Sequence, residues 1–112
     1  MANIRRVVTL VLAAAAITAS APAFAINAST DGAYAYTSGS DHYANIKDTK
    51  KDGHPVKAQY SRNFPDLQVY TLWEKAGYGN TATSGYGGMI YQIRACEYIN
   101  NWPDDCSGWD VD

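Results

Sequence analysis

Two carboxylates and a histidine lie close together near the middle of the chain. Asp48 and Asp52 are four residues apart, and Gly53 and His54 follow directly. Oxygen-rich loops of this kind can surround Ca²⁺, but the alternating series of ligands that ends in Glu is missing. Asp and Gly are also the usual residues of turns. We therefore predict a turn that Asp48 caps and Asp52 and Gly53 form, with His54 beginning a strand. No metal and no other cofactor is expected, and calcium binding is the alternative.

Residues suited to hydrolytic catalysis are scarce. His42 and His54 are the only histidines, and Ser84 lacks the first glycine of a Gly-x-Ser-x-Gly nucleophile turn. Glu74 and Glu97 are the only glutamates, and each is flanked by strand-forming residues. Glycoside hydrolysis by paired carboxylates needs an acid in a partly apolar cleft, and a short chain has little room for a pocket of about 300 Å³ or more. We predict no enzyme activity and no catalytic residues.

Aromatic residues are the feature that most suggests binding. The sequence contains nine Tyr, three Trp and two Phe. Some of these rings fit strands and a core, but Tyr78, Tyr86 and Trp102 lie in segments rich in Gly, Asn, Asp or Pro. Exposed Tyr and Trp rings stack on sugars or fill protein pockets. The alternative is that they only cover the core, with the ring inside and the polar group in water. Tyr78, Tyr86 and Trp102 are the candidate ligand-binding residues.

The only two cysteines, Cys96 and Cys106, permit one intramolecular pairing. A redox pair would usually be closer together, and a zinc site would need two more ligands. An oxidising compartment favours a disulfide. We therefore predict that Cys96 and Cys106 form a structural disulfide.

The first 25 residues have the three parts of a secretory signal peptide. An arginine pair at positions 5 and 6 precedes an apolar run over residues 7–19, and Ala23-Phe24-Ala25 is a small-residue cleavage site. The apolar run is shorter than the about 20 residues that a membrane span needs. We predict cleavage after Ala25, which releases an extracellular domain over residues 26–112 with no membrane attachment. The general secretory route is expected rather than the twin-arginine route.

Charge argues against nucleic acid as a partner. The formal net charge of the chain is −2, and loss of the arginine pair with the leader leaves the remainder more acidic. Nucleic-acid binding needs a basic face that displaces counterions. The lysines near position 50 alternate with Asp48 and Asp52 and indicate a solvated turn.

Short alternating runs separated by turn residues predict an all-β domain. The expected strands cover residues 33–37, 42–47, 56–61, 67–73, 81–83, 89–98 and 107–111. Strands spaced about ten residues apart are typical of a sandwich or small barrel. We predict a single compact antiparallel β-sandwich of about six to seven strands. The run 89–98 should be central, because its isoleucines need cover.

Residues 48–60 contain an Asp-x-x-x-Asp-Gly-His segment before a strand, and Leu72-Trp73 precedes a Gly-rich turn. The segments around Cys96 and Cys106 form a closing pair. Together these features resemble a group of small secreted actinobacterial proteins of unknown function. The resemblance spans about residues 43–109. Members often have a further cysteine just before the first Asp, where this chain has Lys47. The resemblance implies a compact secreted β-sandwich and no particular activity.

These observations predict a secreted, non-enzymatic interaction module whose partner is an unknown extracellular protein or polysaccharide. A proteinaceous inhibitor of an extracellular hydrolase is the first alternative, because small disulfide-linked domains can present an aromatic loop on a rigid frame. A polysaccharide or cell-wall binding module is the second. A protruding loop around Tyr86 would favour a protein partner, whereas a coplanar row of exposed rings would favour a sugar.

Overall fold

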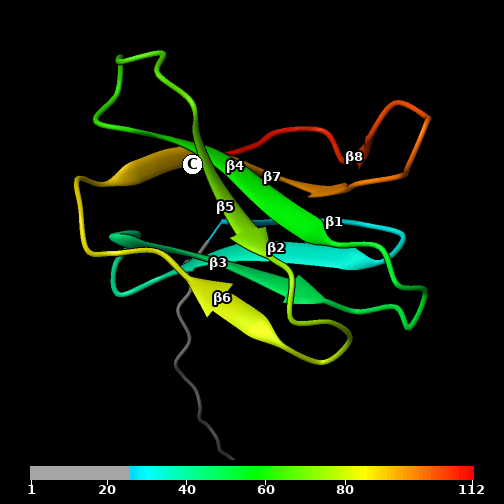
Figure 1. Ribbon diagram of the computed structural model, residues 1–112. Coiled ribbons are helices and arrows are strands. Elements are labelled where there is room, and N and C mark those ends of the chain that lie inside the picture. Colours follow the sequence, from blue (N-terminus) through cyan, green and yellow to red (C-terminus); the bar gives the residue numbers. More distant parts are fainter. Residues whose placement is uncertain (1–25) are drawn as a thin grey trace, which may run out of the picture.

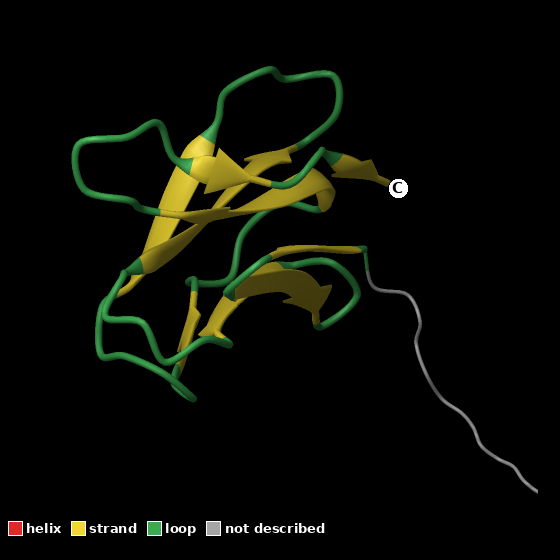
Figure 2. Ribbon diagram, turned by 90° about the vertical axis from the view of Figure 1, so that its right-hand side faces the viewer, coloured by secondary structure: helices red, strands yellow, loops and turns green. Residues whose placement is uncertain are grey.

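The computed structural model describes residues 26–112, which form two antiparallel sheets packed face to face (Figures 1 and 2). The predicted all-β sandwich is therefore confirmed. The predicted signal peptide over residues 1–25 lies outside the described residues. Residues 26–112 contain no helix long and apolar enough to span a membrane.

The two sheets contain nine strands in all. The first sheet has the order β1-β2-β3-β6, from the strands β1 (Asn27–Thr30), β2 (Ala33–Ser38), β3 (Tyr43–Asp48) and β6 (Thr81–Thr83). The second sheet has the order β5-β4-β7-β8, and β9 also pairs with β7. Its strands are β4 (Val56–Arg62), β5 (Tyr70–Glu74), β7 (Ile90–Glu97), β8 (Asp105–Cys106) and β9 (Asp110–Val111).

Two strands, β1 and β8, were not predicted from the sequence. β8 has only two residues, and β1 has the polar sequence NAST, so neither shows a hydrophobic alternation. The Asp31-Gly32 pair, which precedes the first predicted strand, is in fact the turn of the β1–β2 hairpin. Thr30 pairs with Ala33 across it, and Gly32 has a φ of 112°, which glycine adopts without steric cost.

The strand expected over residues 67–73 begins only at Tyr70. Leu67 and Val69 are exposed in the loop that precedes β5. The prediction was wrong here because apolar and β-branched composition favours a half-buried strand but does not exclude an exposed apolar loop.

The core between the sheets consists mostly of small side chains. Its largest fully buried apolar residues are Ile46, Ile90, Ile93 and Val56. The remaining space is filled largely by Ala33, Ala35, Ala44, Ala58 and Ala95. β7 lies centrally in its sheet, as predicted, with β4 on one side and β8 and β9 on the other. A thin core on a short chain provides little stability, so a covalent link is valuable.

That link is the predicted disulfide between Cys96 and Cys106, which is present. The two cysteines are direct partners in the β7–β8 pairing. The disulfide therefore closes the loop that connects these strands and holds the short strand β8 against the sheet.

We expect the double variant Cys96→Ser/Cys106→Ser to unfold at least several degrees below the wild type. The two cysteines are 10 residues apart, and closing a loop of this length removes about 2.5–3 kcal/mol of entropy from the unfolded chain. Thermal melting followed by circular dichroism measures the difference. A reducing agent should lower the melting temperature of the wild type but not that of the variant. Equal melting temperatures, or free thiols in the purified wild type, would contradict the prediction.

Candidate functional site

The paired strands β4 and β7 place two groups of loops at opposite ends of the sandwich. Seven residue pairs join these strands, from Val56 opposite Glu97 to Arg62 opposite Ile90. The loop 49–55 precedes β4 at one end, and the loop 63–69 follows β4 at the other (Figure 1). Each end contains a distinct candidate site.

At the first end, Asp52, His54 and Glu97 form what we call the acid–histidine cluster. One ligand-type atom of each residue lies within 4.8 Å of those of the other two. His54 Nδ1 is 3.5 Å from Asp52 Oδ2 and 3.6 Å from Glu97 Oε2. His54 is partly exposed, whereas Glu97 is buried. The cluster thus connects the surface with the buried end of β7.

The turn predicted around this cluster is confirmed. The Lys50 N–H donates to Asp48 Oδ1 at 3.2 Å, and the His54 N–H donates to Asp52 Oδ1 at 3.0 Å. Both are local side-chain to backbone bonds of the kind that Asp makes in turns. His54 does not begin the strand, since β4 starts at Val56. Asp48 is buried at the end of β3 and does not join the cluster. The group that the structure brings together joins Asp52 to Glu97 rather than to Asp48.

Glu97 is the member of the cluster that the sequence analysis missed. It is only 3% exposed, and Oε2 has no hydrogen-bond partner among the described residues. Burial, followed by the interaction with Asp52, raises the pKa of Glu97 to about 7. The interaction with Glu97 lowers the pKa of Asp52. The pKa values of the two carboxyl groups are therefore shifted in opposite directions.

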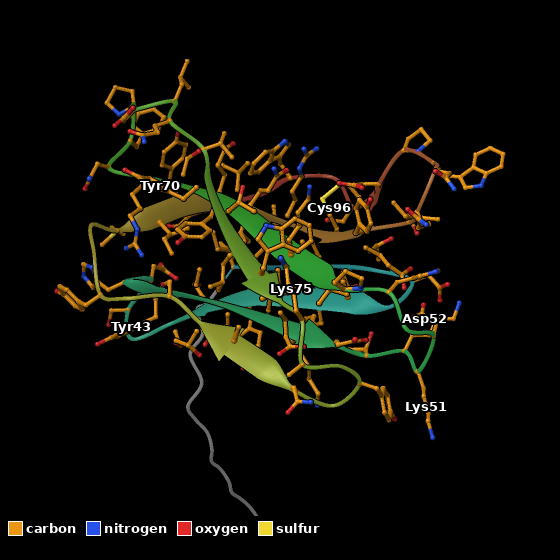
Figure 3. All side chains as sticks on the ribbon, viewed as in Figure 1. Tyr43, Lys51, Asp52, Tyr70, Lys75 and Cys96 are labelled. Atoms are coloured by element: carbon orange, nitrogen blue, oxygen red, sulfur yellow. A yellow bond between two sulfur atoms is a disulfide. The ribbon has the colours of Figure 1, made fainter. Side chains whose placement is uncertain are left out.

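A cavity of about 580 Å³ opens beside the cluster and is larger than the short chain led us to expect. Its lining includes His54 from the cluster, together with Asp48, Lys51, Lys75 and Tyr78. Lys51 and Asp52 come from the same loop, and Lys75 directly follows β5 (Figure 3). The cavity gives solvent and small ligands access to the exposed side of His54.

At the other end, the guanidinium of Arg62 joins two loops. It is buried and donates to the backbone oxygens of His42 at 3.0 Å, Gly85 at 3.1 Å and Gly88 at 2.7 Å. It also donates to Ser84 Oγ at 3.2 Å. These bonds tie the β2–β3 and β6–β7 connections to the last residue of β4. The buried guanidinium of Arg62 therefore holds these two connections together.

Exposed apolar side chains lie on the loop 63–69 and on the β6–β7 connection, residues 84–89. We call this pair of segments the apolar end. Phe64 is 76% exposed and Leu67 is 79% exposed. Val69, Tyr86 and Met89 are also exposed. The loop 63–69 projects from the sheet at the upper left of Figure 1. Single exposed apolar side chains are common, but a group of them on neighbouring loops is a feature of interaction surfaces.

The loop 63–69 is pre-formed despite its exposure. The Asn63 N–H donates to the Met89 oxygen at 2.9 Å, and the Asp66 N–H donates to the Asn63 oxygen at 3.0 Å. The Phe64 ring packs edge-on against Tyr91 with centroids 5.2 Å apart. The Tyr91 hydroxyl donates to the backbone oxygen of Asp66. The first half of the loop, residues 63–66, is therefore fixed to the beginning of β7.

The three aromatic residues predicted to bind a ligand are all exposed but do not form one site. Tyr78 lines the cavity next to the acid–histidine cluster. Trp102 lies in the β7–β8 loop and does not line that cavity. Tyr86 lies at the apolar end, where its ring stacks on His42 with centroids 4.8 Å apart. The sequence analysis missed Phe64 and Leu67, which are exposed in the loop 63–69.

Comparison with known proteins gives no relative. No protein-family model matches the chain, and no curated protein and no solved structure matches it either. Function is therefore inferred from the geometry of the two ends.

We expect the free energy of unfolding of chelator-treated protein to decrease between about pH 4.5 and pH 8. In the folded state the pKa of Glu97 is raised from 4.5 to about 7. This raised pKa stabilises the folded state fully below pH 4.5, and the stabilisation is lost as the pH rises through 7. The loss is roughly 2–3 kcal/mol. The lowered pKa of Asp52 acts only below its usual value of 3.8, outside this range. Urea unfolding at pH 5, 6, 7 and 8 measures the slope.

Glu97→Gln should flatten this slope, because the amide does not titrate. Glu74→Gln is the matched control, since Glu74 is the other buried glutamate and its Oε2 already accepts the Gly77 N–H at 2.9 Å. A wild-type slope in Glu97→Gln would contradict the assignment.

Proposed function

We propose that the protein is a secreted, non-enzymatic interaction module and that its ligand is an extracellular protein. The observation that most supports this is the exposure of Phe64 and Leu67 on a pre-formed loop. Burying a side chain of this size in a partner contributes about 1.5–3 kcal/mol. A loop already held by the contacts of Asn63 with Met89 and of Asp66 with Tyr91 loses less conformational entropy on binding, which increases affinity further.

The side chains at the apolar end favour a protein over a polysaccharide. Leu67, Val69 and Met89 are exposed but have no ring on which a sugar could stack. Aliphatic side chains gain free energy by entering an apolar pocket, which proteins provide and polysaccharides do not.

The exposed aromatic residues on and beside the second sheet give little support to a sugar-binding row. Trp73, Tyr98 and Trp109 are exposed on the second sheet and the segments beside it. The rings of Trp73 and Tyr98 are inclined by 71°, and the guanidinium of Arg94 lies 4.9 Å over the Trp109 ring. A polysaccharide-binding module is therefore the weaker alternative.

Inhibition of an extracellular hydrolase is the specific form of protein binding that this loop suits best. Hydrolase active sites are concave and mostly apolar, and the loop 63–69 is a projecting segment with apolar side chains. Protease–inhibitor interfaces of standard size form with rigid loops of this kind.

Secretion is part of the proposal and is supported by the environment of Ile26. Ile26 is buried, and its N–H donates to Thr37 Oγ1 at 3.1 Å. The Thr37 hydroxyl in turn donates to Asp41 Oδ1 at 2.6 Å. Cleavage after Ala25 would convert this N–H into a charged ammonium at the head of a chain of acceptors that ends in a carboxylate. Charged donors strengthen such bonds.

The apolar end is tested with Phe64→Ser/Leu67→Ser. We expect wild-type bait to crosslink a protein from the culture fluid of the source organism, and the double variant to bind that protein at least about 30-fold more weakly, as for removal of a central apolar contact. Melting temperature should change little, because both side chains are exposed. Tyr98→Ser, on the opposite end of β7, is the matched control and should bind normally. Equal binding by the double variant, or retention of wild type on insoluble polysaccharide alone, would contradict the proposal.

The N-terminal prediction is tested by mass spectrometry and melting. We expect protein recovered from culture fluid to begin at Ile26. Protein with a free Ile26 amine should be about 1 kcal/mol more stable than the same protein acetylated at that amine, because a charged donor is stronger than a neutral one. Asp41→Asn should abolish the difference. Equal stability of the free and acetylated forms would show that Thr37 and Asp41 do not bind an ammonium.

A further inference from the structure

Glu97 presents a buried oxygen without a partner to the acid–histidine cluster. The residue is 97% buried, since only 3% of its surface is exposed, and Oε2 accepts no hydrogen bond from the described residues. An ionised carboxylate in this position is costly unless a proton or a cation satisfies it. Nδ1 of His54 lies 3.6 Å from Oε2.

The distances within the cluster fit ligands of one metal ion better than hydrogen bonds. His54 Nδ1 lies 3.5 Å from Asp52 Oδ2 and 3.6 Å from Glu97 Oε2. An N–H···O hydrogen bond would be about 2.7–3.2 Å long. Two ligands placed about 2.0–2.1 Å from a tetrahedral zinc ion are roughly 3.4 Å apart. The two distances from His54 Nδ1 are therefore close to the spacing of zinc ligands, and the third pair, Asp52 and Glu97, lies within 4.8 Å.

The surroundings hold these ligands in place. A Cβ on Gly32 would lie 2.7 Å from Glu97 Oε2, so the glycine leaves the space that the carboxylate occupies. The Thr49 N–H donates to the Gly32 oxygen at 2.9 Å, which ties the loop of Asp52 and His54 to the same turn. The nearby ammonium of Lys50 is paired with Asp31 at 2.7 Å. Its charge is thereby balanced, and the cluster carboxylates remain available for a cation.

We propose that Asp52, His54 and Glu97 bind one zinc ion. An imidazole nitrogen with two carboxylate oxygens is a zinc-type ligand set, whereas calcium and magnesium take oxygen ligands only. Three protein ligands leave a fourth position for water. His54 is partly exposed and also lines the adjacent cavity, which provides the path by which the ion enters.

The test is a titration of chelator-treated, disulfide-intact protein with zinc chloride at pH 7.5. We expect calorimetry to show one zinc per chain and the melting temperature to rise by several degrees. Calcium and magnesium at the same concentration should produce a much smaller rise. If a proton alone satisfies Glu97, zinc will neither bind stoichiometrically nor change the melting temperature, and the proposal fails.

Variants identify the site. Glu97→Gln and His54→Asn should each weaken zinc binding more than about tenfold, the least expected for removing a direct ligand. Glu97→Gln should remain folded without zinc, because it removes the unpartnered charge and keeps the shape of the side chain. Loss of zinc binding in this variant is therefore not a consequence of unfolding.

The chain offers a matched control for each ligand. Glu74→Gln changes the only other glutamate, and His42→Asn changes the only other histidine. Both should bind zinc as the wild type does. Wild-type affinity in Glu97→Gln, or a loss of binding in His42→Asn but not in His54→Asn, would overturn the proposal.

Discussion

The register of β4 against β7 determines where both ends of this molecule form. Val56 and Ala58 face the core, and Lys57 between them faces outward. Because side chains alternate along a strand, a shift of one residue would turn every side chain of β4 to the opposite face. The same register brings Glu97 beside the residues that precede β4 and brings the end of β4 beside the start of β7. The two sites therefore depend on one pairing in the middle of the sheet.

Buried polar groups order the ends of a sandwich whose core is thin. The charge of Arg62 is solvated by four oxygen atoms from the loops around it. Glu74 accepts a backbone N–H within its own turn. Both groups have the partners that buried polar groups in native proteins normally have. Glu97 differs because one of its oxygens has none, and this difference distinguishes a group that organises the fold from one that is free to bind.

The sequence was sufficient for the fold because alternation and turn residues are local signals. Two cysteines allow only one pairing, so the disulfide was also predictable. Only part of the acid–histidine cluster could be predicted from the sequence. Asp52 and His54 are close in sequence, but Glu97 is brought to them by the pairing of β7 with β4. Leu67 was placed in a strand because an exposed apolar loop and a half-buried strand have the same composition. Its exposure depends on where β5 begins, which tertiary contacts decide.

Arg62 holds the backbone of the apolar end and makes few demands on its side chains. Three of its bonds go to backbone oxygens, which any residue can supply. A Cβ on Gly87 would lie 2.5 Å from the Arg62 guanidinium, and one on Gly88 would lie 2.0 Å from the Asn63 side chain. These two glycines are fixed by the geometry, whereas the exposed side chains of Leu67 and Val69 make no such close approach to Arg62. Substitutions at Leu67 and Val69 can therefore change the surface of the apolar end without changing the bonds that hold its connections together.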